Sequence, residues 1–261
     1  MTRRAGRGSG AAGVAVADLR YAYPGASEGT AVLVDVTFDV APGERVAILG
    51  PNGAGKTTLM LHLNGILSPD EGHVAVDGVR VSRESVHEVR RRVGLVFQDP
   101  DDQLFMPTIG EDVAFGPANY GVSGTALEER VGAALAQVGL AGSEARYPQR
   151  MSLGERRRAA IATILAMEVD VVVLDEPTSN LDPTARRELS TTLSALPATQ
   201  IVVTHDLPFA LEVCPRALVL DDGRIVADGP TRELLADDAL LAAHGLELPW
   251  GFDPGRTQAG A

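Results

Sequence analysis

One stretch of the chain constrains its fold more than any other: RVAILGPNGAGKTTLMLHLNGIL, at residues 45–67. An apolar segment typical of a buried strand runs into a glycine-rich loop, and apolar residues at helical spacing follow. From Gly50 to Thr57 the loop matches G-x-x-x-x-G-K-T, a pattern that turns backbone N–H groups around a polyphosphate at a helix N-terminus. A glycine-rich turn that holds a lysine by chance is the alternative, and both flanks disfavour it. The stretch therefore predicts an α/β core around a phosphate-binding loop.

The lysine in this loop has no counterpart elsewhere in the chain. Of the 23 basic residues, 22 are arginines and only Lys56 is a lysine. A compact ammonium on a flexible stem can reach the outer phosphates, a role that a forked guanidinium does not fill. We expect Lys56 to act on the phosphates and the Thr57 hydroxyl to bind Mg²⁺. The predicted nucleotide contacts of the loop are Gly50, Pro51, Asn52, Gly53, Ala54, Gly55, Lys56, Thr57 and Thr58.

Two acidic residues, Asp175 and Glu176, end the apolar segment VDVVVL. A magnesium ion needs a further oxygen ligand from the protein, and a carboxylate at a strand end can meet the ion held by Thr57. Asp175 is the predicted ligand, and Glu176 is predicted to orient and polarise the water that attacks the γ-phosphate. The alternative, that Asp-Glu-Pro merely caps a strand, is disfavoured by the phosphate loop in the same chain.

Two more polar residues follow apolar segments in the same way: Gln98 follows VGLVF, and His205 follows QIVVT. The carboxyl ends of parallel strands converge on one ligand crevice. We therefore expect Gln98 to touch Mg²⁺ or the lytic water, and His205 to touch the γ-phosphate. A histidine at a strand end is often only structural, but the company of the two acids favours a functional role.

Strand and helix patterns organise the rest of the chain. Strand patterns separated by turns before residue 100 predict an antiparallel sheet beside the core, and residues 216–229 predict a hairpin. Residues from about 100 to 165 lack strand patterns and predict a helical insertion. We expect one domain over residues 14–245, between a flexible N-terminal tail (1–13) and a C-terminal tail (246–261).

Composition excludes several classes of protein. The net charge of −12, from 35 acidic and 23 basic residues, disfavours nucleic acid as a partner. Arginine runs at 90–92 and 156–158 could form a basic patch, but we expect solvated helix faces there. Cys214 is the only cysteine, so no internal disulfide is possible and a reducing cytosol fits. No apolar run approaches the roughly 20 residues that span a bilayer.

A second helix start, MSLGE at residues 151–155, stands well apart from the phosphate loop. Ser152 and Glu155 have the S-x-x-E spacing of a capping box. The same helix start offers an anion site made by the Ser152 hydroxyl, the Gly154 N–H and the helix dipole. Because the phosphate loop already encloses one side of a nucleotide, we predict that this second site meets the nucleotide of another copy of the chain.

Together these segments resemble, in their order, the motifs of ATP-binding cassette (ABC) ATPases, from about residue 14 to 245. The resemblance implies a P-loop NTPase core with a mixed sheet, an N-terminal antiparallel β subdomain and a helical insertion, with ATP and Mg²⁺ as cofactors. It also implies a head-to-tail dimer that sandwiches two ATP molecules and drives a membrane partner from the cytoplasmic face. GPNGAGKTT, Gln98, MSLGERRRAAIA, VVVLDEP, SNLD (179–182) and His205 are similar to the Walker A, Q-loop, signature, Walker B, D-loop and H-loop.

The resemblance adds two nucleotide contacts and one departure from the family pattern. Tyr23 matches the aromatic position that stacks on adenine, with a core or turn tyrosine as the alternative. Asp182 matches the D-loop aspartate that faces the other subunit, and its place before a proline also predicts a helix N-cap. Met151, Leu153 and Glu155 depart from the usual L-S-G-G-Q signature. Glu155 brings a negative charge near the expected ribose of the partner's nucleotide.

The segment FQDPDDQLF, at residues 97–105, resembles the Q-loop region of energy-coupling factor ATPases, which serve importers of vitamins and of cobalt or nickel. Asp99, Asp101 and Asp102 are predicted counter-charges for arginines on the coupling helices of a transmembrane component; an exposed acidic turn is the alternative. The signature variant S-L-G-E and the ending HGLELPWGF are more similar to the cobalt/nickel branch. None of the five histidines has paired ligand spacing, so a substrate-capture membrane component is expected to bind the metal instead.

Other classes of cassette protein fit less well. A chromosome-maintenance ATPase needs long heptad arms, and only 119 positions separate Lys56 from Asp175. A ribosome-acting cassette protein usually carries two cassettes and basic linkers, and a non-catalytic cassette lacks the glutamate present at 176. We expect a homodimer with two competent ATP sites. A heterodimer with a sister ATPase, a vitamin importer and a non-transport ABC ATPase stay open as alternatives.

Overall fold

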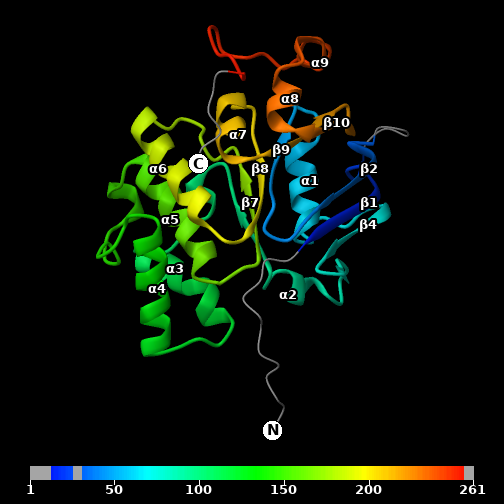
Figure 1. The fold of residues 1–261 in the computed structure, drawn as a ribbon. Coiled ribbons are helices and arrows are strands. Elements are labelled where there is room, and N and C mark those ends of the chain that lie inside the picture. The colour runs from blue at the N-terminus through cyan, green and yellow to red at the C-terminus, as the bar shows by residue number, and fades with distance from the viewer. Residues whose placement is uncertain (1–12, 26–30, 256–261) are drawn as a thin grey trace.

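The computed structural model describes residues 13–25 and 31–255 (Figure 1). The flexible tail predicted for residues 1–13 lies outside these described residues except for Gly13, and so does the last part of the predicted C-terminal tail. No helix within the described ranges is long and apolar enough to cross a membrane.

A six-stranded sheet forms the centre of the molecule. Its strands are β3 (Arg45–Leu49), β6 (Val93–Val96), β7 (Val171–Asp175), β8 (Thr199–Val203), β9 (Arg216–Asp221) and β10 (Arg224–Pro230). They lie in the order β10-β9-β3-β8-β7-β6, and all neighbours are parallel except the hairpin of β9 and β10. Every residue of β6, β7 and β8 is buried, as both faces of a covered parallel sheet require.

A smaller antiparallel sheet packs beside the central one. It holds four strands in the order β2-β1-β4-β5 and consists of β1 (Val14–Tyr21), β2 (Leu33–Val40), β4 (Glu71–Val76) and β5 (Val79–Arg80). Helix α1 (Lys56–Leu63), which follows the phosphate loop, lies between the two sheets (Figure 1). Its side chains Leu59, Met60 and Leu63 are buried in one apolar cluster with residues of both sheets. The start of α1 is therefore fixed by packing on two sides.

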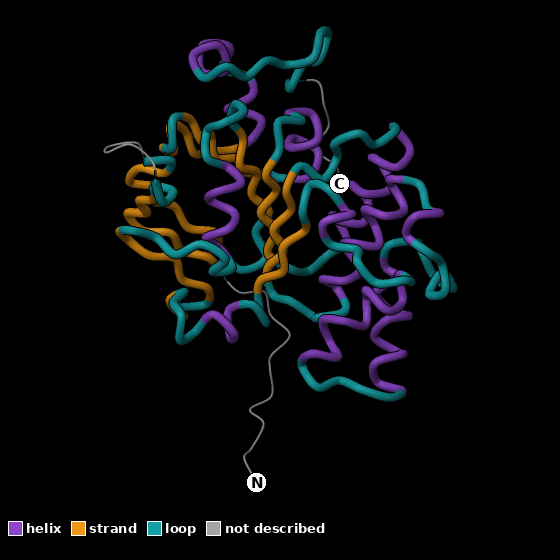
Figure 2. Tube along the Cα trace, turned by 180° about the vertical axis from the view of Figure 1, so that it is seen from behind, coloured by secondary structure: helices purple, strands orange, loops and turns teal. Residues whose placement is uncertain are grey.

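Helices cover the other face of the central sheet (Figure 2). Between residues 100 and 165 the chain forms helices and no strand: η1 (Pro100–Asp102), α3 (Ile109–Asn119), α4 (Thr125–Gln137), η2 (Pro148–Arg150) and α5 (Leu153–Leu165). The predicted α/β core with a mixed sheet, the antiparallel sheet and the helical insertion are thereby confirmed. The remaining helices are α2 (Val86–Val89), α6 (Pro183–Ala195), α7 (Leu207–Val213), α8 (Thr231–Leu235) and α9 (Asp238–Ala243).

The segment after α9 packs on the main apolar core. Leu246 is buried, and Leu248 and Phe252 are partly buried against the same cluster. The packed part of the chain therefore continues past residue 245, into the segment predicted to begin a tail.

Helix α5 lies directly against the backbone of β6. A Cβ atom at Gly94 would lie 2.0 Å from the Cγ2 atom of Ile164 on α5. We expect Gly94→Ala to lower the free energy of unfolding by about 1–3 kcal/mol, because the added methyl group forces helix and strand apart. Urea unfolding followed by circular dichroism measures this change.

Gly132→Ala is the matched control. Gly132 lies within α4, and a Cβ atom there meets nothing within 4 Å. The free energy of unfolding should stay unchanged or rise by up to about 1 kcal/mol, since alanine favours a helix over glycine. Equal effects of the two substitutions would show that α5 and β6 are not packed as described.

Candidate active site

The phosphate loop runs from the end of β3 to the start of α1 and is held close to neighbouring backbone. Gly50 has a φ of 154°, and a Cβ atom there would lie 2.0 Å from the carbonyl oxygen of Leu220 on β9. Gly55 has a φ of 101°, and its Cβ atom would lie 2.9 Å from the carbonyl oxygen of Val32. Only glycine tolerates both the conformation and the contact at these positions. The loop can therefore follow β3 tightly and present N–H groups at the helix start.

Lys56 is almost fully buried inside this loop. Its ammonium donates to the carbonyl oxygens of Gly50, at 2.7 Å, and of Pro51, at 2.9 Å. Burial lowers the pKa of Lys56, while the nearby carboxylates of Glu176 and Asp175 oppose that shift. The Lys56 ammonium has lost part of its contact with water, and it lies beside a loop of N–H donors. Both features favour the binding of a polyanionic ligand.

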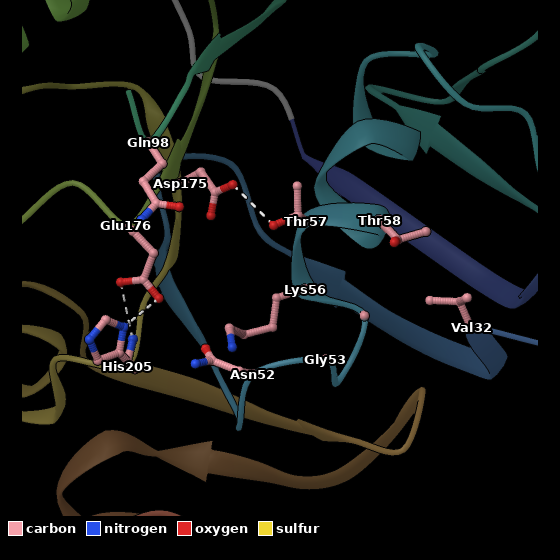
Figure 3. A pocket seen from close by; sticks show the side chains of 11 residues that line it. Val32, Asn52, Gly53, Lys56, Thr57, Thr58, Gln98, Asp175, Glu176 and His205 are labelled. Carbon is pink, nitrogen blue, oxygen red and sulfur yellow. Dashed lines mark hydrogen bonds and ion pairs between the residues drawn. The ribbon is translucent and has the colours of Figure 1, made fainter. Parts of the chain in front are cut away.

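Thr57 and Asp175 are brought into contact although 118 positions separate them. The Thr57 hydroxyl donates to Oδ2 of Asp175 at 3.1 Å (Figure 3). Burial raises the pKa of Asp175, and the bond from Thr57 opposes the rise. Adjacent oxygen ligands of an octahedral Mg²⁺ ion lie about 3 Å apart, because each Mg–O distance is about 2.0–2.1 Å. The two oxygens are therefore spaced, and chemically suited, for a shared magnesium ion.

Glu176 follows directly and is held in a left-handed backbone conformation, with a φ of 43°. Its Oε1 atom lies 2.7 Å from Nδ1 of His205 (Figure 3). Its Oε2 atom accepts from the Thr204 hydroxyl at 3.1 Å and from the His205 N–H at 3.3 Å. The carboxylate is thus fixed by the end of β8, while the side chain of His205 remains 64% exposed.

These side chains line one open pocket of about 460 Å³ (Figure 3). The pocket contains predicted residues from the loop and from the ends of β6, β7 and β8, and it adds Val32, which the sequence analysis missed. Gly50, Pro51 and Ala54 belong to the same loop but do not line it. The lining residues are Val32, Asn52, Gly53, Gly55, Lys56, Thr57, Thr58, Gln98, Asp175, Glu176 and His205.

Tyr23 stands at the edge of this region, on the side of α1. Its hydroxyl shares a hydrogen bond with the Thr58 hydroxyl at 3.1 Å, and its ring contacts Tyr21 edge-on, with centroids 5.1 Å apart. The side of the ring remains accessible, since the residue is 44% exposed. Tyr23 is therefore a surface aromatic that faces the phosphate-loop helix.

The predicted contacts at 151–155 lie elsewhere and do not line the pocket. Ser152 caps α5: its hydroxyl accepts from the Glu155 N–H at 3.3 Å, and Oε2 of Glu155 accepts from the Ser152 N–H at 2.8 Å. A Cβ atom on Gly154 would lie 2.8 Å from Cβ of Ala185 on α6, so this glycine is also required for helix packing. Within one chain, Ser152, Gly154 and Glu155 therefore lie outside the phosphate pocket.

The negative charge of Glu155 is paired within the chain. Oε1 of Glu155 lies 2.7 Å from Nη1 of Arg146. This bond, with those from Ser152, lowers the pKa of Glu155 to about 2. The surface at Glu155 therefore carries an arginine–carboxylate pair instead of an isolated anion.

Asp182 is an N-cap, as its place before a proline predicted. Its Oδ1 atom accepts from the N–H groups of Thr184, at 2.8 Å, and Ala185, at 3.0 Å, at the start of α6. These bonds lower the pKa of Asp182.

Within residues 13–25 and 31–255, no group of three or more His, Cys, Asp or Glu side chains could hold a metal ion.

Several residues that shape the site were not identified from the sequence. Arg146 and Thr204 hold Glu155 and Glu176, and Arg157 donates to backbone carbonyls at the pocket edge. Thr204 could have been found, because it is the first polar residue after the apolar run of β8. The other two depend on partners far away in the sequence.

Known proteins resemble this chain in both sequence and fold. A family model described as ABC transporter matches residues 33–179. A Streptomyces coelicolor protein with the name "Putative ABC transporter ATP-binding protein SCO3161" is 60% identical over 94% of this chain and 93% of its own length. The energy-coupling factor transporter ATP-binding protein EcfA of Methanothermobacter thermautotrophicus is 46% identical over 89% of this chain and 75% of its own.

Two solved structures have the same fold. The structure of cbiO1 from Clostridium perfringens, part of the ABC transporter complex cbiONQ, has a TM-score of 0.78 and 36% identity over 90% of this chain and 95% of its own. The dimeric post-hydrolysis state of the ATP-binding cassette MJ0796, bound to ADP and Pi, has a TM-score of 0.76 and 27% identity over 84% and 98%. The chain therefore belongs to the ABC transporter family, as an ATP-binding and ATP-hydrolysing subunit of a transporter.

Proposed function

We propose that this chain is the ATPase of an energy-coupling factor importer for cobalt or nickel, and that Glu176 is its catalytic base. One observation supports the catalytic part of this proposal: two side-chain pairs, Thr57 with Asp175 and Glu176 with His205, lie next to each other in the same pocket. The first pair suits a metal-bound phosphate, and the second suits a water molecule beside that phosphate.

The phosphate-loop N–H groups and Lys56 hold the β- and γ-phosphates, and Lys56 exchanges its two loop carbonyls for phosphate oxygens. Thr57 and Asp175, with Gln98 at the next strand end, would hold Mg²⁺, which neutralises phosphate charge when bound. Tyr23 stacks on the adenine ring.

Glu176 orients a water molecule and accepts its proton on a carboxylate oxygen as the water oxygen bonds to the γ-phosphorus. The bond from that phosphorus to the bridging oxygen breaks, which releases ADP and phosphate. His205 keeps the carboxylate in place through Nδ1 and lies where it can contact the γ-phosphate.

Glu176→Gln should reduce ATP hydrolysis by about 10²- to 10⁴-fold, because the amide cannot accept the proton of the water. ATP binding should persist, so ATP-bound dimers should accumulate. Phosphate release, nucleotide binding and size-exclusion chromatography measure the three properties. Glu129→Gln, an exposed position on α4, is the control and should change none of them. Normal hydrolysis by Glu176→Gln would overturn the assignment of the base.

The complete ATP site is expected to need two chains. Ser152 and Gly154 lie outside the phosphate pocket of their own chain. Ser152 caps α5 and Gly154 lies in its first turn, and the N-terminus of such a helix suits a phosphate. In a head-to-tail dimer they would contact the γ-phosphate bound by the second chain, with Glu155 near its ribose and Asp182 at the subunit boundary. The dimeric state of the similar cassette MJ0796 supports this arrangement. A homodimer fits a chain that carries every motif, and a sister ATPase is the alternative partner.

The transmembrane component is expected to dock near residues 99–102. Asp102 is exposed there, and Asp101 forms an ion pair with Arg156, with 3.2 Å between Oδ1 and Nε. Oδ1 of Asp99 accepts a hydrogen bond from the N–H of Asp101 at 2.9 Å. Beside them Phe105 is 62% exposed and packs edge-on against a second aromatic ring. Exposed acids next to an apolar surface suit a helix that carries arginines.

Charge reversal tests this docking site. Asp101→Lys with Asp102→Lys should weaken recruitment of the ATPase to membranes that contain the transporter, because like charges then face each other. ATP affinity should not change, since neither residue lines the phosphate pocket. Membrane co-sedimentation and nucleotide binding measure the two effects, with Asp238→Lys on the distant helix α9 as the control. Recruitment equal to wild type would refute the site.

The energy-coupling factor type is supported by the similarity to EcfA and by the Q-loop segment. The choice of cobalt or nickel rests on the signature variant S-L-G-E and the ending HGLELPWGF. A substrate-capture membrane component would select the ion, and this chain would act as a peripheral subunit at the cytoplasmic face. Uptake of radiolabelled nickel and cobalt should fall to background in cells that carry Glu176→Gln, with biotin and riboflavin uptake unchanged. Loss of vitamin uptake instead would favour the vitamin branch, and no change in either would favour an ABC ATPase outside import.

A further inference from the structure

The middle residue of the arginine run at 156–158 is buried, so the expected solvated helix face is wrong for that position. Arg157 is only 3% exposed, whereas both of its neighbours form ion pairs with more exposed carboxylates. Burial lowers the pKa of Arg157, although the charges of Asp99 and Glu176 oppose that shift. A guanidinium removed from water must find acceptors within the protein.

The acceptors are two backbone carbonyl groups just beyond neighbouring strands. Nη1 of Arg157 donates to the carbonyl oxygen of Glu176 at 2.5 Å, and Nη2 donates to that of Gln98 at 2.7 Å. Gln98 follows β6 and Glu176 follows β7, and these strands are adjacent in the sheet. One side chain thus spans two of the strand ends that contribute to the phosphate pocket.

Glu176 needs such support because of its backbone. A non-glycine residue with a φ of 43° carries a conformational cost, and it persists where its surroundings hold it. The N–H group of Glu176 donates to Val203 at 2.8 Å, and its carbonyl group accepts from Arg157. Both peptide groups that flank its Cα atom are therefore held. Together they set the direction in which the carboxylate leaves the backbone.

Arg157 also belongs to α5, the helix that begins at the second anion site. Ser152 caps this helix and Gly154 lies in its first turn, so all three residues move with one helix. The gap between α5 and the strand ends is open, with a cavity of about 480 Å³ that Arg157, Leu153 and Gln98 help to line. Arg157 therefore bridges this gap, and displacement of α5 would act directly on the peptide of Glu176.

We propose that Arg157 is a positioning residue that couples the helix start at Ser152 to the catalytic carboxylate of the same chain. Contact of Ser152 and Gly154 with the nucleotide of a second copy fixes the position of α5. Arg157 then orients the carboxylate of Glu176 within the pocket of its own chain. Each chain thereby senses one ATP and hydrolyses the other. The proposal rests on the proposed function, in which Glu176 is the base and the dimer shares its ATP sites.

Arg157→Gln and Arg157→Lys test the positioning role. We expect kcat for ATP hydrolysis to fall by about 10- to 100-fold in the glutamine variant, the loss that a misplaced catalytic group produces. The lysine variant keeps the charge but can reach fewer acceptors, so its loss should be smaller. The affinity for ATP should stay within about twofold of wild type in both, since Arg157 does not line the phosphate pocket.

Arg158→Gln is the matched control on the same helix, because it removes a guanidinium that pairs with Glu188. It should leave kcat unchanged. Equal losses in Arg158→Gln and Arg157→Gln, or a loss of ATP affinity that matches the loss of kcat, would overturn the positioning role. Thermal unfolding checks that each variant is folded; if the glutamine variant is not, the lysine variant carries the same comparison.

A double-mutant cycle tests the coupling. Removal of the hydroxyl in Ser152→Ala should lower kcat less in the Arg157→Gln background than in wild type, because its effect passes through the arginine. If Ser152→Ala lowers kcat by the same factor in both backgrounds, the proposed coupling is refuted. Glu176→Gln, measured in the same assay, tests the proposed function separately: normal ATP hydrolysis by this variant would refute the proposed function, whatever the effect of Arg157→Gln.

Discussion

Parallel strands that pair in register end along one edge of their sheet, and the site depends on that constraint. β6, β7 and β8 are buried along their whole length, so the polar side chains that can reach a ligand stand at the last residue of a strand or just beyond it. Gln98, Glu176 and His205 occupy such positions. Residues more than a hundred positions apart in the chain thereby meet without any local signal that links them.

The electrostatics of the pocket follow from the same burial. Desolvation raises the pKa of Asp175 and lowers that of Lys56, so both groups carry their charges at a cost. A polyphosphate offers negative charge to the lysine, and a divalent cation offers positive charge to the aspartate. The pocket is therefore more complementary to a metal–nucleotide complex than to either component alone.

Sequence reasoning located residues whose position follows from their place along one strand or one helix. Asp175 and Glu176 were recognised because an apolar run ends at them, and the cap at Ser152 because its partner lies three positions on. Arg157 was missed since a run of three arginines on a helix does not reveal which one faces inward. Its burial depends on carbonyl groups 19 and 59 positions away, which only the tertiary fold brings within reach. Val32 was missed for the same reason: nothing local distinguishes it from other surface valines.

The departure of this chain from the usual signature sequence has a consequence for how it can evolve. Both oxygens of Glu155 are engaged, one by Arg146 and one by the N–H of Ser152. A change to glutamine alone would keep the cap through its carbonyl oxygen but leave an arginine without its counter-ion. A change of Arg146 alone would leave the carboxylate of Glu155 without its counter-ion at the start of α5. The two positions, nine residues apart, therefore limit each other's substitutions, because a change at either one leaves the charge of the other unpaired.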